Sequence, residues 1–172
     1  WYPDPMTAHK AGFVALAGLP NAGKSTLLNA LLGFKLSIVS SKPQTTRHRL
    51  LGILEGEGFQ ACLLDTPGLI AEAGDPLQKA LRVESSRAIR EDADLLVYLV
   101  DAMSADPSKL EHIPSREGAP AILVLNKVDR SPAESKPAAL AAAYGERLKP
   151  VKTLRISALK REGVDELKRE IL

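Results

Sequence analysis

The chain has 172 residues, of which 45% are hydrophobic and 26% charged, and its formal net charge is +2. This length suits one domain with a single core, and the apolar runs are too short for a membrane-spanning helix. So small a net charge does not by itself indicate a nucleic-acid partner. Cys62 is the only cysteine, which excludes a disulfide within the chain, and we expect it in the core. No secretory signal is recognisable, so we expect a cytoplasmic location.

A phosphate-binding loop is predicted between the first strand, residues 13–17, and the first helix, residues 24–32. Residues 18–25 read Gly-Leu-Pro-Asn-Ala-Gly-Lys-Ser and fit the pattern G-x-x-x-x-G-K-[ST]. In this pattern Lys24 reaches the β and γ phosphates of a nucleotide, and the Ser25 hydroxyl holds Mg²⁺. Backbone N–H groups of the loop and of the helix N-terminus surround the phosphates. The residues expected to do so are Asn21, Ala22, Gly23, Lys24, Ser25 and Thr26. The pattern predicts a nucleotide but not which one.

The rest of the chain alternates between predicted strands and helices. The further strands are residues 50–55, 61–65, 95–101, 121–126 and 153–157, and the further helices are residues 76–91, 108–116, 132–148 and 164–172. Gly56-Glu57-Gly58 is a hairpin signal between the first two of these strands. This order predicts an α/β fold, with a six-stranded, mostly parallel sheet, one antiparallel edge strand and helices on both faces. Residues 35–49 fit no element, and long connections of this kind are usually functional or mobile.

An acidic residue and a glycine follow the predicted strand that ends near residue 65. Ligands of open α/β sheets bind beyond the carboxyl ends of the strands, so we expect this segment to lie near the phosphate loop. It reads Asp-Thr-Pro-Gly at residues 65–68. Asp65 can orient the shell of Mg²⁺, and the Gly68 N–H can meet the γ-phosphate. Taken alone, the segment could also be an ordinary turn.

Two later segments carry groups that fit a guanine base. In Asn126-Lys127-Val128-Asp129, the aspartate can accept hydrogen bonds from guanine N1–H and N2–H₂, a pair that adenine lacks. The Lys127 stem can cover the base, and Asn126 can tie this loop to the phosphate loop. In Ser157-Ala158-Leu159, a backbone N–H can donate to guanine O6. Each segment alone could instead cap a helix, and an ATPase or kinase would share the phosphate loop but give Asp129 no purpose. The order of all four segments predicts a guanine-nucleotide site.

The combination of these segments resembles the bacterial Era family of translation-factor-related GTPases. The segments that carry the resemblance are Gly-Leu-Pro-Asn-Ala-Gly-Lys-Ser-Thr-Leu-Leu-Asn at 18–29, Ser-Ile-Val-Ser-Ser-Lys-Pro-Gln-Thr-Thr-Arg-His-Arg at 37–49, Asp-Thr-Pro-Gly-Leu at 65–69 and Asn-Lys-Val-Asp at 126–129. Lys-Pro-Gln-Thr-Thr-Arg favours Era over the GTPases that modify tRNA, which tend to have Gly-Thr-Thr-Arg-Asp there. The resemblance implies a Ras-like G domain that hydrolyses GTP to GDP and phosphate, with a role in assembly of the small ribosomal subunit.

The resemblance also implies roles in hydrolysis. Residues 35–49 correspond to switch I, in which Thr46 binds Mg²⁺ when GTP is present, with Thr45 as the alternative. Leu69 stands where Ras-like proteins have the glutamine that orients the attacking water, so intrinsic hydrolysis should be slow. Relatives with a hydrophobic residue there often use K⁺ held by a phosphate-loop asparagine, here Asn21. Hydrolysis would then depend on Lys24, Asn21, Thr46 and Gly68. The alternative is a module that binds GTP or GDP without useful hydrolysis.

The expected G domain spans residues 6–172, after a leader at residues 1–5. The leader, Trp-Tyr-Pro-Asp-Pro, is either the remnant of an expression tag or a linker displaced by circular permutation, since Era-like proteins often have Tyr-Pro-acid after the G domain. Era-type proteins continue into an RNA-binding KH domain. We expect no such domain in this chain, so contacts with RNA or the ribosome are not expected of it alone.

Overall fold

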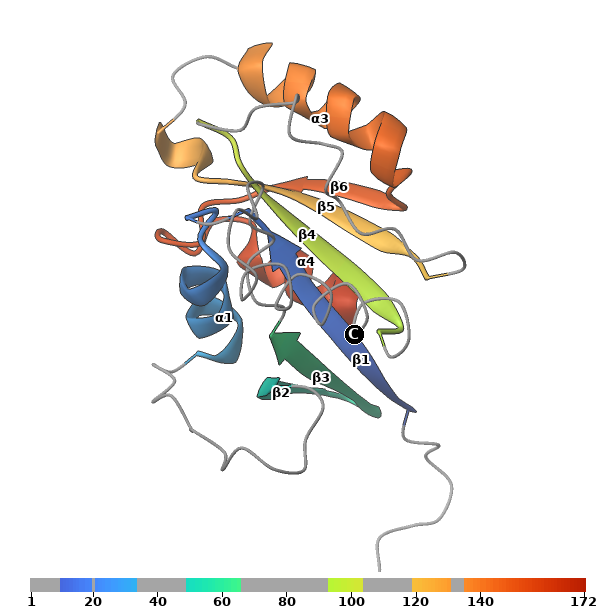
Figure 1. The fold of residues 1–172 in the computed structure, drawn as a ribbon. Coiled ribbons are helices and arrows are strands. Elements are labelled where there is room, and N and C mark those ends of the chain that lie inside the picture. The colour runs from blue at the N-terminus through green and yellow to red at the C-terminus, as the bar shows by residue number, and fades with distance from the viewer. Residues whose placement is uncertain (1–9, 20, 34–48, 66–92, 104–118, 131–134) are drawn as a thin grey trace, which may run out of the picture.

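A computed structural model of the chain describes residues 10–19, 21–33, 49–65, 93–103, 119–130 and 135–172. Their strands form one six-stranded sheet in the order β2-β3-β1-β4-β5-β6 (Figure 1). The elements are β1 (Lys10–Gly18), α1 (Lys24–Leu32), β2 (Arg49–Gly56), β3 (Phe59–Asp65), β4 (Leu95–Asp101), β5 (Ala121–Asn126), the 3₁₀ helix η2 (Val128–Arg130), α3 (Ser135–Leu148), β6 (Lys152–Arg155) and α4 (Val164–Ile171).

The sheet is parallel except at one edge. Strand β1 pairs in parallel with β3 and β4, and β5 pairs in parallel with β4 and β6. Only β2 runs antiparallel to its neighbour β3. The turn between them places Gly58 at φ 78°, a left-handed conformation that glycine adopts without strain. This arrangement confirms the predicted mostly parallel sheet with an antiparallel edge strand.

Helices cover both faces of the sheet, which explains why its central strands are apolar at nearly every position. All residues of β5 are buried, and so are most of β4, as expected for parallel strands packed on two sides. Helices α1 and α4 pack on one face through Leu27, Leu31 and Leu167. Helix α3 lies on the other face (Figure 1). There the Tyr144 ring lies 6.1 Å from that of Tyr98. Among the described helices, none has the length and apolar character needed to cross a lipid bilayer.

Several predicted boundaries differ from the observed ones. Strand β1 begins at Lys10, before the predicted start, and β6 ends at Arg155 because Ser157 leaves the ladder and bridges Glu162. Cys62 is only half-buried, so the predicted core position is wrong; its neighbours across the sheet, Phe13 and Ile53, are both exposed. The predicted helices at residues 76–91 and 108–116 lie outside the described residues, as does the predicted start of α3 at residue 132.

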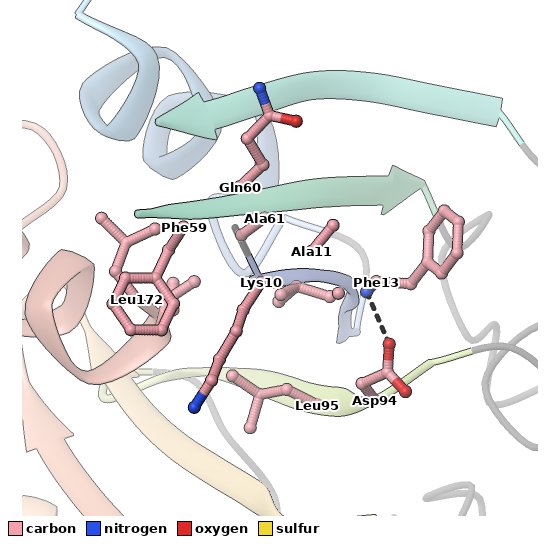
Figure 2. Close-up of a pocket in the computed structure, with 12 residues that line it drawn as sticks. Lys10, Ala11, Phe13, Phe59, Gln60, Ala61, Asp94, Leu95 and Leu172 are labelled. Atoms are coloured by element: carbon pink, nitrogen blue, oxygen red, sulfur yellow. Dashed lines mark hydrogen bonds between the residues drawn. The ribbon is translucent and has the colours of Figure 1, made fainter. Parts of the chain in front are cut away.

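A pocket of about 200 Å³ lies at the amino ends of β1 and β3, opposite the phosphate loop (Figure 2). Its lining includes Phe59, Leu95 and Leu172, and the Lys10 ammonium lies 5.9 Å from the centre of the Phe59 ring. Asp94 accepts a hydrogen bond of 2.8 Å from the Phe13 backbone N–H. Apart from Lys10, Gln60 and Asp94, the residues that line this pocket are apolar or glycine.

Candidate nucleotide-binding site

The phosphate loop connects the carboxyl end of β1 to α1, and a glycine lies at each end of it. Gly18 has φ 153° and Gly23 has φ 101°, conformations that side chains rarely allow. A Cβ atom at Gly18 would collide with the Leu99 carbonyl oxygen, and one at Gly23 would collide with the Asn126 side-chain amide. Both glycines of the sequence pattern are therefore required by the backbone conformation and by close neighbours.

The start of α1 supplies positive potential to this loop. The hydrogen bonds of the helix begin with the Leu27 N–H, which donates to the Gly23 carbonyl at 2.9 Å. The N–H groups of Ser25 and Thr26 precede that bond, so no carbonyl within the helix accepts from them. Amides at this position attract anions, and the helix dipole adds to the effect. The Lys24 ammonium lies at the loop as well, donating to the Gly18 carbonyl at 2.9 Å and the Leu19 carbonyl at 3.3 Å.

Asn126 connects the end of β5 to two other loops. Its side chain is 2% exposed, and its amide nitrogen donates to the Ala22 carbonyl of the phosphate loop at 2.9 Å. Its amide oxygen accepts from the Ala158 N–H, in the loop after β6, at 3.0 Å. Both ends of this buried amide are therefore satisfied. The structure thus contains the predicted tie between Asn126 and the phosphate loop, and it extends that tie to Ala158.

Lys127 forms a second link to the phosphate loop. It adopts a left-handed backbone conformation, with φ 67°. Its ammonium donates to the Asn21 carbonyl and, at 2.8 Å, to the carboxylate of Asp101 at the end of β4. Sequence reasoning missed Asp101, because no residue pattern marks it. The only signal was its position as the last residue of a buried strand, the position that Asp65 also has in β3.

Asp129 lies in η2 beside the loop after β6. A hydrogen bond from the Ser157 hydroxyl lowers the pKa of the Asp129 carboxyl, and the nearby charges of Lys160 and Arg130 act in the same direction, whereas desolvation opposes them. Ser157 is fully buried, and its hydroxyl oxygen accepts from the Lys160 N–H at 3.1 Å. Asp129 is therefore held as a carboxylate, the form that accepts hydrogen bonds.

The remaining predicted site residues are placed to different degrees. Asn21, Ser25 and Thr26 are exposed, and the Leu159 side chain is 68% exposed. Asp65 is the last residue of β3 and pairs in register with Leu16 of β1, the strand that leads into the phosphate loop. Thr46 and Gly68 lie outside the described residues, as does Leu69. The structure thus brings the phosphate and base segments together at the carboxyl ends of the strands.

These segments also occur together in a known protein family. A family model described as "50S ribosome-binding GTPase" matches residues 13–127, which include the phosphate loop, Asn126 and Lys127. The chain belongs to this GTPase family.

Individual members of the family are similar along nearly the whole chain. GTPase Era of Bradyrhizobium sp. (strain BTAi1) is 44% identical over 173 residues, which cover 99% of this chain and 55% of that protein. GTPase Era of Xanthomonas axonopodis pv. citri (strain 306) is 40% identical over 166 residues, covering 95% of this chain and 55% of that protein. The chain therefore spans about half the length of these curated relatives. Their names confirm the predicted resemblance to Era.

A solved structure of an Era protein has the same fold as this chain. The crystal structure of Era in complex with MgGDPNP and a fragment of 16S ribosomal RNA superposes with a TM-score of 0.75 at 35% sequence identity, covering 94% of this chain and 56% of that one. The superposition confirms the predicted Ras-like G-domain fold.

Proposed function

We propose that this chain is an Era-type G domain that binds GTP and GDP with Mg²⁺ and hydrolyses GTP to GDP and phosphate. The observation that carries the proposal is the hydrogen bonding of Asn126, which joins the phosphate loop at Ala22 to the loop after β6 at Ala158. One buried side chain thereby sets the spacing between the place for phosphates and the place for a base. The relatives named GTPase Era support the same assignment.

Each part of the site has a role in this proposal. The amides of residues 21–26 and the Lys24 ammonium bind the phosphates, since they gather at the start of α1. Asp129 accepts from guanine N1–H and N2–H₂, and the hydrogen bond with the Ser157 hydroxyl, which lowers the pKa of Asp129, orients the carboxylate. The stem of Lys127 covers one face of the base. A backbone N–H in the loop of Ala158 and Leu159 donates to guanine O6.

The residues at the start of α1 fit a Mg²⁺ ion that is shared with the nucleotide. The part of the chain that the structure describes contains no cluster of three or more His, Cys, Asp or Glu side chains that would hold a metal alone. Mg²⁺ usually keeps several waters and takes one or two protein oxygens besides phosphate oxygens, and the exposed Ser25 hydroxyl fits such a ligand. We assign the Mg²⁺ shell to Ser25, Asp65 and Thr46. When bound, Mg²⁺ neutralises charge on the β and γ phosphates.

Hydrolysis is proposed to be slow without K⁺. Leu69 offers no group to orient water, and the Gly68 N–H is assigned to the γ-phosphate. The exposed side chain of Asn21 belongs to the phosphate loop and carries an amide oxygen, a suitable ligand for a monovalent cation. K⁺ held there would neutralise charge between the β and γ phosphates, as an arginine finger does.

The test measures nucleotide affinity and single-turnover GTP cleavage in KCl and in NaCl. We expect binding of GTP and GDP but not ATP, and faster cleavage in KCl. Asn21→Ala should remove the KCl effect and retain GDP binding, whereas Gln60→Ala, an exposed amide at the other end of the sheet, should behave as wild type. Equal rates in both salts would reject the role of K⁺. Binding without cleavage in either salt would leave a guanine-nucleotide-binding module and reject the enzyme.

The cellular role of this G domain is proposed to be in assembly of the small ribosomal subunit, in the cytoplasm. The support is the similarity to Era proteins, one of which is bound to a 16S ribosomal RNA fragment in its crystal structure. Contacts with RNA are assigned to a KH domain outside the 172 residues. Co-sedimentation of the chain with small ribosomal subunits, alone and fused to such a domain, tests this division: binding by the chain alone would contradict it.

A further inference from the structure

Asp101 is placed where it controls the position of Lys127. It is the last residue of β4, and one carboxylate oxygen lies 2.8 Å from the Lys127 ammonium. Both side chains are largely buried, with 14% of Asp101 and 24% of Lys127 exposed. A lysine ammonium that is withdrawn from water needs compensating partners, and a carboxylate is the strongest of them. The pair is therefore different from a surface salt bridge, whose contribution is small.

The carboxylate of Asp101 is itself fixed in place. Its second oxygen accepts from the Met103 N–H at 2.9 Å, which closes a turn directly after β4. The Ala102 N–H donates to the Asn126 carbonyl at 2.9 Å, so this turn is bonded to the residue that precedes Lys127. Asp101 also pairs in register with Asn126 across β4 and β5. The distance between the carboxylate and the Lys127 backbone is thus set by the sheet.

The lysine side chain spans the gap between this carboxylate and the phosphate loop. Its ammonium also donates to the Asn21 carbonyl, so the stem is held at its far end by two acceptors from separate loops. A lysine has four carbon atoms in its stem, and ordering it costs rotamer entropy. Because two acceptors hold the ammonium, the stem is already ordered before a ligand binds, so binding does not lose this entropy again.

We propose that Asp101 is a positioning residue for nucleotide binding: it holds the Lys127 stem where a guanine base packs on it. The inference rests on the proposed function, because it assumes that the stem of Lys127 covers the base. It adds the end of β4 and the turn after it to the site, and it makes the ionic contact with Lys127 a determinant of guanine-nucleotide affinity and dissociation rate.

The test compares Asp101→Asn with wild type in the full chain, by measuring the affinity and the dissociation rate of GDP. Asparagine keeps an oxygen for the Met103 N–H but loses the charge that faces Lys127, so it separates positioning of the lysine from closure of the turn. We expect GDP affinity to fall about three- to tenfold, mainly through faster dissociation. Asp101→Glu, which keeps the charge, should recover part of the loss. Asp94→Asn is the matched control, since Asp94 also accepts a backbone N–H but at the opposite end of the sheet.

A double-mutant cycle with Lys127→Met decides the mechanism. If Asp101 acts through Lys127, the Asp101→Asn substitution causes no further loss of affinity in the Lys127→Met background. The same fold loss in both backgrounds, or no loss in the wild-type background, would overturn the inference and leave the proposed function standing. Failure of the wild-type chain to bind GDP would overturn both. Thermal unfolding without nucleotide measures any general destabilisation, which should be larger in the wild-type background, because only there does the substitution break the ion pair with Lys127.

Discussion

The two ends of the parallel strands are built from different chemistry. At the carboxyl ends, side chains bond from one loop to another: Asn126 reaches Ala22, and Lys127 reaches Asn21 and Asp101. At the amino ends, Phe59 and its apolar neighbours line a pocket (Figure 2). Asp94 also accepts a hydrogen bond there from the Phe13 backbone N–H. Side-chain hydrogen bonds thus hold the loops at the first end relative to one another, whereas the pocket at the second end is lined mainly by apolar groups.

Backbone conformations show the same contrast. Asn21 and Lys127 at the carboxyl ends have positive φ angles of 62° and 67°, although neither is glycine. Such residues cost about 1 kcal/mol or more each, and they persist where surrounding contacts determine them. Lys149, in the connection that leads into β6 at the amino ends, also has a positive φ angle of 46°, but no described non-glycine residue of the pocket does. The contrast therefore concerns the nucleotide-site loops and the pocket: substitutions in the loops should change ligand binding, and substitutions in the pocket should change stability.

The largest expected effect is a change of base preference in Asp129→Asn. Asparagine offers one acceptor and one donor where the carboxylate offers two acceptors, so guanine loses a partner and xanthine, which has an oxygen at C2, gains one. We expect GDP affinity to fall by about two to four orders of magnitude and XDP affinity to rise. Competition between a fluorescent GDP and XDP measures both. Because the expected result includes a gain of binding, a misfolded variant cannot imitate it; equal loss for both nucleotides would contradict the role of Asp129.

The next effect in size is expected for Asn126→Ala, the one substitution that should affect both binding and stability. It leaves the Ala22 carbonyl and the Ala158 N–H without a partner in a buried place. We expect a loss of about 2 to 4 kcal/mol in the free energy of unfolding and a large loss of GDP affinity, measured by urea unfolding and titration calorimetry. A full loss of affinity with unchanged stability would mean that Asn126 contacts the ligand without holding the loops together.

A smaller effect is expected for Ser157→Ala, through the carboxylate of Asp129. The Ser157 hydroxyl lowers the pKa of Asp129 below its usual value, so the wild-type carboxylate stays ionised into acidic solution, and its contribution is lost only as the pH falls through the lowered pKa. In the variant the pKa rises toward its usual value, so GDP affinity should decline at a higher pH. At neutral pH the carboxylate is ionised in both proteins, so the loss of about three- to tenfold that we expect there comes from the lost hydrogen bond that orients Asp129. Identical pH profiles of GDP affinity for both proteins would contradict this link.

Most of the described fold could be predicted, because it follows from local patterns. The buried apolar run of β5, the glycine-rich turn between β2 and β3, and the apolar stripe of Val164, Leu167 and Ile171 each determine their own element. The phosphate loop and the Asn126–Asp129 segment were equally visible, since their chemistry requires particular residues at fixed spacing. The roles assigned to these residues stay predictions until binding is measured.

The features that escaped prediction depend on contacts between distant segments. Asp101 lies 26 positions before Lys127, and only the pairing of β4 with β5 brings the two together. Cys62 occurs in an apolar run, which favours burial, yet its face of the sheet carries the exposed Phe13 and Ile53 beside it. Neither sequence spacing nor hydrophobicity contains this information, because both results depend on which strands are neighbours.

The smallest effect on binding is expected for Phe59→Ala, at the amino ends of the strands. Phe59 is 37% exposed, so the substitution should remove part of its packing and lower the free energy of unfolding by about 1 to 2 kcal/mol. GDP affinity should stay as in wild type, because the residue lies at the end of the sheet opposite the phosphate loop. Urea unfolding and GDP titration of Phe59→Ala, with Phe59→Leu as the conservative control, measure the two quantities separately. The unfolded fraction of Phe59→Ala accounts for only a small fall in apparent GDP affinity. A larger fall would show that the two ends are coupled through β1 and β3, and that the division between them is wrong.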